Sequence, residues 1–514
     1  MSKTIIIIGA GLAGLSAALQ AAENGCNVKL VSSLPSERAQ SVMAEGGINA
    51  ALNTKDENDS PEEHFTDTIK AACGLADPNA VWGMTQAAPE LVHWLLKLGV
   101  KFNMSGYDDV DLRNFGGQKK KRTAFAQSDT GKQIMTAMID AVRRKEASGM
   151  VERFSHHSFL TLRLCGNICC GCVIRDEYSQ ETVELPGDAV IVATGGMHGL
   201  FGNTTGSLSN TGEVTAELFR LGVPLANGEM IQYHPTTVKC GGKRMLISEA
   251  ARGEGGRLFA MKDGKQWYFM EEKYPELGNL MPRDITAREI WKVSHESEVF
   301  LDMTEISEEI ISNKLSGLAD DCMTYLHKDI RKEPVSVLPG IHYFMGGILV
   351  DWQHRTPIQN LCAAGECCAQ YHGANRLGGN SLLGALYGGR VAAKSACEQA
   401  DVVDLSCATQ IDFPPASQIS EIKQLNKVMQ ETMGVVRNEN TLLNGIQTVQ
   451  ALTGNLSLLG MAVLKSALAR KESRGAHWRE DYPKSNDDDY LKTTVARFDG
   501  KQIQISFVPV PERR

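Results

Sequence analysis

A run of four isoleucines directly before a glycine-rich turn is the feature that most constrains the fold. Residues 4–8 are a threonine and four isoleucines, a β-branched run typical of a buried strand. Gly9, Gly11 and Gly14 follow in Gly-x-Gly-x-x-Gly spacing, and an apolar helical pattern continues to residue 23. A second apolar run occupies residues 27–31. This order predicts the strand–helix–strand opening of an α/β, Rossmann-like dinucleotide-binding domain.

Each glycine of this turn has a physical role. Gly9 permits the tight turn, Gly11 (after Ala10) lets a pyrophosphate approach the backbone, and Gly14 lets helix and strand pack closely. The general motif also expects an acidic residue near the end of the second strand, to bind a ribose. Here that strand ends in serines, and the nearest acid is Glu37.

The composition narrows the class of protein. A chain of 514 residues that is 42% hydrophobic can bury a large core in two or three domains. The net charge of −8, with no dominant basic stripe, argues against nucleic acid as a partner. The densest basic run, residues 118–122, is predicted to be a solvated loop. The apolar stretch 4–22 contains the functional glycines, so we expect no membrane span.

Thirteen cysteines in a long chain without a secretion signal predict reduced thiols and a cytoplasmic setting. Four of them, at positions 165, 169, 170 and 172, match neither the ferredoxin run nor paired zinc ligands. Gly166 and Asn167 predict a hairpin turn there instead. No metal site is predicted.

Later segments divide the chain into regions. Residues 188–196 predict a strand that returns to the first sheet and ends in Ala193, Thr194 and Gly195. Residues 223–340, with helical patterns at 284–298 and 304–317, have the character of an inserted domain before glycine-rich sequence resumes. We therefore expect a cofactor domain formed by 1–222 and 341–402, and a capping domain formed by 223–340. Residues 403–514 are expected to form a C-terminal helical domain, with helices at 416–433 and 440–471, a loop at 484–489 and an extended tail at 502–510.

Histidine and arginine recur in separate glycine-bearing turns. The residues concerned are His234, Glu249, Arg252, Arg283, His342 and Arg376. Arginine binds planar carboxylates through two parallel hydrogen bonds, so several such turns converging predict a site for a dicarboxylate.

These motifs, in this order over residues 3–485, resemble the flavoprotein subunits of fumarate reductase and succinate dehydrogenase. The resemblance implies FAD as cofactor, a small dicarboxylate as substrate (fumarate or succinate), and an iron–sulfur protein as electron donor. It implies that Phe115, His234, Thr236, His342 and Arg376 bind the substrate. It implies that Arg283 gives the proton, supplied through Arg252 and Glu249, while reduced flavin delivers hydride from N5. The FAD-binding residues implied are Gly9, Ala10, Gly11, Gly14, Ser32, Gly46, Gly47, Ala193, Thr194, Gly195, Glu366, Ser381 and Leu382.

One departure from the family affects the cofactor. Many members link FAD covalently to a histidine that precedes a glycine pair, and here Gln40 stands at that place before Gly46 and Gly47. An amide is not a nucleophile, so the FAD is expected to be non-covalent. In this resemblance, loss of the link lowers the flavin potential and favours fumarate reduction over succinate oxidation.

Three other functions are compatible with these motifs. L-aspartate oxidase shares the scaffold, but typically has a glutamate where this chain has Asn114 or Phe115. Another enoate reductase on the same scaffold is a further alternative, and a non-catalytic flavin-binding subunit is the least favoured. The expected location is cytoplasmic, with contact to the inner face of a membrane only through partner subunits.

Overall fold

The computed structural model describes residues 2–106, 109–399, 410–415 and 417–514. At its centre is a five-stranded parallel sheet in the order β20-β10-β1-β2-β6. Its strands are β1 (Thr4–Ile8), β2 (Asn27–Ser32), β6 (Val151–Ser155), β10 (Ala189–Val192) and β20 (Leu361–Ala363). The predicted strand–helix–strand opening and the return of a later strand to the same sheet are confirmed.

The isoleucine run is buried on both faces of this sheet. Ile5 and Ile7 pack into the core formed with the helices, and Ile6 and Ile8 pack into a second core on the opposite face. That second core includes the antiparallel sheet β7 (His157–Cys165), β8 (Ile168–Asp176) and β9 (Thr182–Pro186). A strand covered on both sides needs apolar residues at every position, which explains the continuous run.

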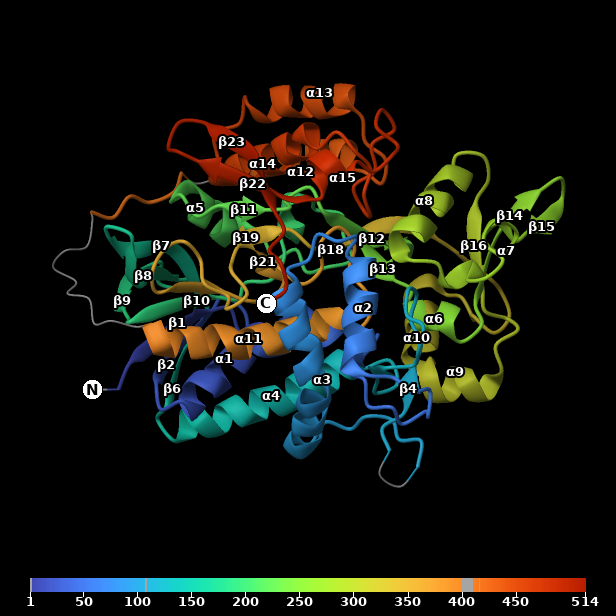
Figure 1. Cartoon of the computed structure of the whole chain (residues 1–514), viewed down its shortest axis with the longest axis horizontal. Helices are drawn as coiled ribbons and strands as arrows, with labels where there is room; N and C mark the ends of the chain where they lie inside the picture. Colours follow the sequence, from blue (N-terminus) through green and yellow to red (C-terminus); the bar gives the residue numbers. More distant parts are fainter. Residues whose placement is uncertain (1, 107–108, 400–409, 416) are drawn as a thin grey trace.

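Helices cover the other face of the central sheet (Figure 1). Helix α1 (Leu12–Glu23) packs beside α11 (Asn380–Gln399), although the two helices are far apart in the sequence. Also in this layer are α3 (Pro78–Leu98) and α4 (Thr130–Ala147), with α2 (Pro61–Ala71) against α3. A small sheet orders β3 (Ile48–Asn49), β5 (Thr123–Ala124) and β4 (Leu112–Arg113). The N-termini of α1 and α11 thereby reach one edge of the sheet.

Most of residues 223–340, the segment expected to form a capping domain and called the cap below, lies to one side of this core (right in Figure 1). Its sheet is ordered β15 (Lys265–Trp267), β14 (Arg257–Lys262), β16 (Val299–Asp302) and β17 (Val335–Ser336). Its helices are α6 (Glu249–Gly253), α7 (Phe269–Lys273), α8 (Arg283–Val293), α9 (Glu308–Lys314) and α10 (Ser316–Asp321). A second sheet, β13 (Lys243–Leu246), β12 (Ile231–Cys240) and β18 (Leu338–Phe344), connects the cap to the core.

The C-terminal region contains helices α12 (Ile419–Thr432), α13 (Glu439–Val449) and α14 (Asn455–Ala469). The single helix expected at 440–471 is therefore wrong in part, because this stretch forms two helices. The extended tail forms a hairpin, β22 (Lys492–Phe498) and β23 (Ile503–Pro509), which completes a sheet with three strands of the core region. Those strands are β11 (Leu225–Ala226), β19 (Gly347–Leu349) and β21 (Cys368–Ala369). The expected loop at 484–489 is wrong in part, because Asn486 caps the short helix α15 (Asp487–Tyr490). The predicted boundary at 402/403 and the first residue of the predicted helix 416–433 lie outside the described residues.

The cysteine-rich hairpin is also as predicted. Gly166 and Asn167 form the turn between β7 and β8, and Cys169, Cys170 and Cys172 are buried free thiols. Cys165 is disulfide-bonded, contrary to the expectation that all thiols are reduced. Within the described ranges no group of three or more His, Cys, Asp or Glu side chains is arranged to hold a metal, and no helix is long and apolar enough to cross a membrane.

Candidate functional site

A cavity of about 570 Å³ runs from the first βα turn to the cap. It connects the glycine turn after β1 with the end of β2, the loop at 43–47, the first turn of α11 and the start of α8. Nearly all predicted site residues line it: Gly9, Ala10, Gly11, Ser32, Gln40, Gly46, Gly47, Phe115, Ala193, Thr194, Gly195, His234, Glu249, Arg283, His342, Glu366, Arg376, Ser381 and Leu382. Gly14, Thr236 and Arg252 do not line it.

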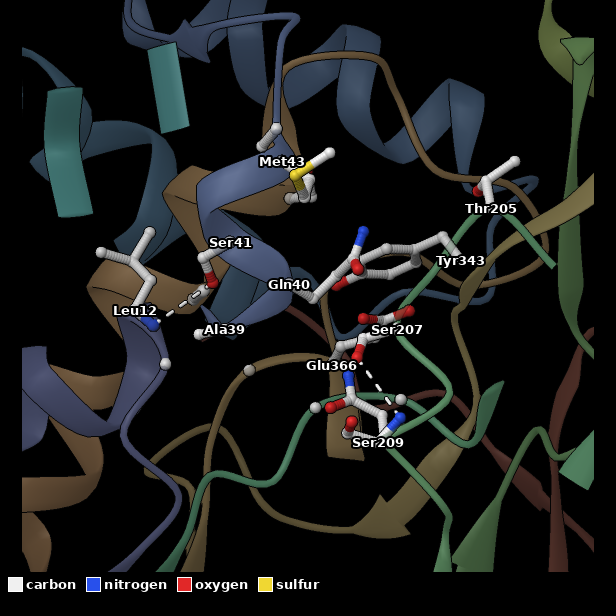
Figure 2. Close-up of a pocket in the computed structure, with 18 of the residues that line it drawn as sticks. Leu12, Ala39, Gln40, Ser41, Met43, Thr205, Ser207, Ser209, Tyr343 and Glu366 are labelled. Atoms are coloured by element: carbon white, nitrogen blue, oxygen red, sulfur yellow. Dashed lines mark hydrogen bonds between the residues drawn. The ribbon is translucent and has the colours of Figure 1, made fainter. Parts of the chain in front are cut away.

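The end of the cavity at the βα turn is suited to a pyrophosphate. Gly9 has φ +108°, and a Cβ there would lie 2.3 Å from the carbonyl oxygen of Ala193. At Gly11 a Cβ would meet nothing closer than 3.7 Å, so this position is open toward the cavity. Helix α1 begins at Leu12, whose N–H donates to Ser41 Oγ at 3.3 Å (Figure 2). A helix N-terminus beside an open glycine backbone favours a phosphate group.

Gly14 acts in packing rather than at the cavity surface. A Cβ at Gly14 would lie 1.8 Å from the carbonyl oxygen of Gly9, so helix and strand meet there as the motif predicts. At the end of β2, Ser32 Oγ is buried without a hydrogen-bond partner among the described residues. A buried hydroxyl beside the cavity is suited to a ribose hydroxyl, so the residues present fit the adenosine half of FAD.

A loop in the middle of the cavity is clamped by an arginine. The Arg113 guanidinium donates to the carbonyl oxygen of Gly46 through Nε at 3.0 Å and Nη2 at 2.5 Å. Gly47 has φ +133°, and a Cβ there would lie 2.5 Å from the carbonyl oxygen of Ala124. The loop and the first turn of α11, with Ser381 and Leu382, line the same cavity. Two adjacent glycines without side chains leave room there for a planar group such as the flavin ring.

Figure 2 shows Gln40 and Ser41 on the short helix η2 (Gln40–Met43), with Thr205, Ser207 and Ser209 on another segment of the wall. Glu366 lies in η6 (Gly365–Cys367) and accepts a hydrogen bond from the backbone N–H of Phe344 at 3.1 Å. The side chain of Glu366 is thereby fixed at the cavity wall.

Two histidines and an arginine converge at the cap end. The rings of His234 and His342 meet edge to face, with centroids 5.1 Å apart. His234 Nδ1 lies 3.1 Å from the carbonyl oxygen of Thr236, and its Nε2 is buried without a partner among the described residues. The Arg376 guanidinium lies over the ring of Tyr343, 4.4 Å from its centroid. Thr236 itself donates to Ile247, so its hydroxyl is already occupied.

Arg283, at the start of α8, is held from two sides. Its Nε donates to Glu249 Oε2 at 2.7 Å, and its Nη1 donates to Gln232 Oε1 at 3.1 Å. Arg252 lies behind this pair, with Nη2 3.5 Å from Glu249 Oε1. Arg283, Glu249 and Arg252 therefore form a buried row of charged groups that begins at the cavity wall and leads away from it.

Burial and charge set the ionisation of this site. Burial would raise the pKa of Glu249, but the charges of Arg283 and Arg252 outweigh it and hold that pKa below its usual value. Burial, together with the charge of Arg283, lowers the pKa of His234 and His342 well below the usual value and that of Arg376 to about 9. The site thus holds neutral histidines beside cationic arginines, and an anion entering it would relieve the repulsion between the arginines.

Sequence reasoning missed several residues of this site. Gln232 links Arg283 to the Arg376 loop, because its Nε2 donates to the carbonyl oxygen of Arg376 at 2.8 Å. Its position two residues before His234 was the available signal. Thr205, Lys243 and Arg244 also line the cavity, and no local pattern in the sequence distinguishes them from surface residues.

Comparison with known proteins decides the family. A family model described as an FAD binding domain matches residues 4–382, and one described as fumarate reductase flavoprotein C-term matches residues 451–513. The succinate dehydrogenase flavoprotein subunit of Bacillus subtilis is 38% identical over 576 aligned positions, covering 100% of this chain and 98% of its own. This chain belongs to the succinate dehydrogenase and fumarate reductase flavoprotein family. The family consists of FAD-dependent oxidoreductases acting on CH–CH groups, so the predicted resemblance and enzyme class are confirmed.

Relatives named as succinate dehydrogenases and relatives named as fumarate reductases are both similar to this chain. The 8-methylmenaquinol:fumarate reductase flavoprotein subunit of Wolinella succinogenes is 32% identical, covering 100% of this chain and 92% of its own. A solved E. coli quinol fumarate reductase superposes with a TM-score of 0.90 at 27% identity, covering 99% of this chain and 97% of its own. The predicted fold class is confirmed by this match. The direction of catalysis differs among these relatives, so family membership alone does not assign it.

Proposed function

We propose that this flavoprotein reduces fumarate to succinate. The observation that carries the proposal is Arg283, a guanidinium at the cavity wall whose position is fixed by Glu249 and which shares the cavity with His234, His342 and Arg376. Two carboxylates need cationic or N–H donors at both ends of the substrate, and these residues supply them. The proton needed at the alkene carbon would come from Arg283 and be replaced through Glu249 and Arg252.

FAD, when bound, would supply the hydride from its reduced ring. The residues of this chain would bind and orient both partners. Gly46 and Gly47 would lie against the ring, and the N-terminus of the 20-residue helix α11, at Ser381 and Leu382, would face the part of the ring that becomes negative on reduction. Phe115, which is 2% exposed and lines the same cavity, would keep water from the substrate.

The FAD is proposed to be non-covalent and the direction reductive. Support comes from Gln40, which lies at the cavity wall where the linking histidine is expected and carries no nucleophilic atom. L-aspartate oxidase is less well supported, because Asn114 and Phe115 offer no counter-charge for the ammonium group of aspartate.

We further propose that an iron–sulfur protein delivers electrons and that any membrane contact is made by partner subunits. The relatives are named as flavoprotein subunits, which supports a multi-subunit assembly. The isolated chain should then accept electrons from a reduced viologen and not from a quinol. Quinol oxidation by the isolated chain at a rate similar to that with viologen would contradict this.

The test of the proposed reaction is anaerobic reoxidation of the dithionite-reduced, FAD-loaded protein by fumarate, followed through the flavin absorbance. Rapid reoxidation in the wild type, lost in Arg283→Ala, supports fumarate as the substrate and Arg283 as the proton donor. If the wild-type flavin stays reduced, the fumarate assignment is wrong, and aspartate oxidation and other enoates are to be tested next.

A further inference from the structure

Thr205 contacts the ring of His342 through its side-chain hydroxyl. Its Oγ1 is 2.8 Å from His342 Nδ1, and both residues line the cavity. Thr205 is on the loop that follows β10, whereas His342 is on β18, so the contact joins two segments 137 residues apart. Nothing in the local sequence marks this threonine as part of the site.

The direction of this hydrogen bond can be derived from its surroundings. The Thr205 hydroxyl has two acceptors in reach among the described residues: His342 Nδ1 at 2.8 Å and the carbonyl oxygen of Ile341 at 3.4 Å. The second distance is longer than a normal O–H···O bond. The Ile341 carbonyl also already accepts from the backbone N–H of Thr205 at 3.0 Å. The hydroxyl proton therefore goes to Nδ1.

We propose that Thr205 is a positioning residue that fixes His342 as the tautomer with its proton on Nε2, so that His342 donates a hydrogen bond to a substrate carboxylate. A neutral imidazole carries one N–H, and the hydrogen bond at one nitrogen decides which nitrogen holds the proton. Because Nδ1 accepts from Thr205, Nε2 must be the donor. This inference rests on the proposed dicarboxylate site.

His234 provides the contrast within the same site. Its Nδ1 lies 3.1 Å from the carbonyl oxygen of Thr236, which can only accept, and 3.3 Å from the backbone N–H of the same residue, which can only donate. These two contacts make opposite demands on Nδ1 and select neither tautomer of His234. The two rings lie edge to face in one cavity, and His342 is the one whose tautomer a single hydroxyl fixes.

The experiment has two independent readouts on the FAD-loaded protein. The first is the ¹⁵N NMR spectrum of labelled histidine, with His342 assigned through His342→Asn. Nδ1 of His342 should show the chemical shift of an unprotonated nitrogen.

The second readout is the Kd for malonate, a non-reducible dicarboxylate, measured from the change in flavin absorbance. Thr205→Val should raise this Kd about tenfold, because it removes the donor to Nδ1 and frees the ring to turn. Thr205→Ser keeps the hydroxyl and should restore the wild-type Kd to within about twofold.

A matched control is Thr432→Val, which removes a buried hydroxyl that bonds the carbonyl oxygen of Val428 within α12 and does not line the cavity. It should leave the Kd unchanged. A proton on Nδ1 of wild-type His342 overturns the inference without any variant, as does a Thr205→Val protein that retains FAD and the wild-type Kd. If wild-type protein does not bind malonate, the dicarboxylate site of the proposed function fails, while the NMR result still decides the tautomer.

Discussion

Glu249 Oε2 accepts a hydrogen bond from Arg283 Nε at 2.7 Å and forms an ion pair with Nη2 of the same guanidinium at 2.6 Å. Its other oxygen accepts from the backbone N–H of Gly116 at 3.0 Å. Both side chains are buried, so the carboxylate fixes the guanidinium in one orientation at the cavity wall. A carboxylate held in this way can both position Arg283 and return a proton to it.

Glu249→Gln should slow reoxidation of the reduced flavin by fumarate by about 10²–10⁴-fold, the usual contribution of general acid–base catalysis. The amide keeps the shape of the side chain but can neither carry the charge nor pass the proton. Stopped-flow absorbance measures the rate. Glu271→Gln is the matched control, because Glu271 pairs with Arg257 on the cap, away from the cavity. A Glu249→Gln rate within threefold of the wild type would falsify the relay.

Arg376→Gln should weaken malonate binding roughly 10- to 100-fold, since a charge-assisted contact to one carboxylate is lost. Arg376→Lys should restore little of it, because an ammonium group lacks the planar fork of a guanidinium. Flavin difference spectroscopy gives both Kd values. Recovery of full affinity in the lysine variant would show that charge alone is sufficient.

The two glycines of the first turn should respond differently to alanine. Gly9→Ala places a Cβ 2.3 Å from a carbonyl oxygen at φ +108°, so it should destabilise the FAD-free protein by about 2 kcal/mol. Gly11→Ala has room in the fold and should leave that stability unchanged, while obstructing the pyrophosphate and raising the Kd for FAD. Thermal unfolding and FAD titration separate the effects. Equal loss of stability in both variants would contradict this assignment.

The FAD of the wild type should be released completely by acid precipitation, and should appear in the supernatant with no flavin left on the denatured chain. The reason is that Gln40 offers no nucleophilic atom to the cofactor. Gln40→His supplies an imidazole at the same place, and retention of flavin in its precipitate would show that the geometry permits the link. Flavin retained by precipitated wild-type protein would show that another residue forms a covalent bond.

Glu45 should make the stability of the FAD-free protein depend on pH. Burial, with the nearby charge of Asp321, raises its pKa to about 8 from an unfolded value near 4.5. Between these values the folded state holds a proton that the unfolded state has lost, so stability is full below about pH 4.5 and falls as pH rises toward 8. Glu45→Gln should reduce this loss. Thermal unfolding at pH 6 and pH 9 checks it, and an identical pH dependence in both proteins would refute the role of Glu45.

Local patterns in the sequence determined the framework of this protein. The isoleucine run, the spacing of Gly9, Gly11 and Gly14, and the hairpin turn at Gly166 each follow from short-range sterics and burial, and each is found in the fold. The segments bearing His234, Arg283, His342 and Arg376 were identified because glycine-rich turns with charged residues are unusual. The short helix at 487–490 was missed, because one capping Asn gives a weak signal in a polar run.

Tertiary structure alone decided which of these side chains meet and how each is oriented. Thr205 and His342 are 137 residues apart, and Gln232 and Arg376 are 144 apart, so no sequence window contains either pair. The tertiary structure also places Arg252 and Thr236 away from the cavity surface, and it joins the C-terminal hairpin to strands of the core. Residue type and spacing specify local conformation. The direction of a hydrogen bond, or the pKa of a buried group, depends on partners that only packing brings together.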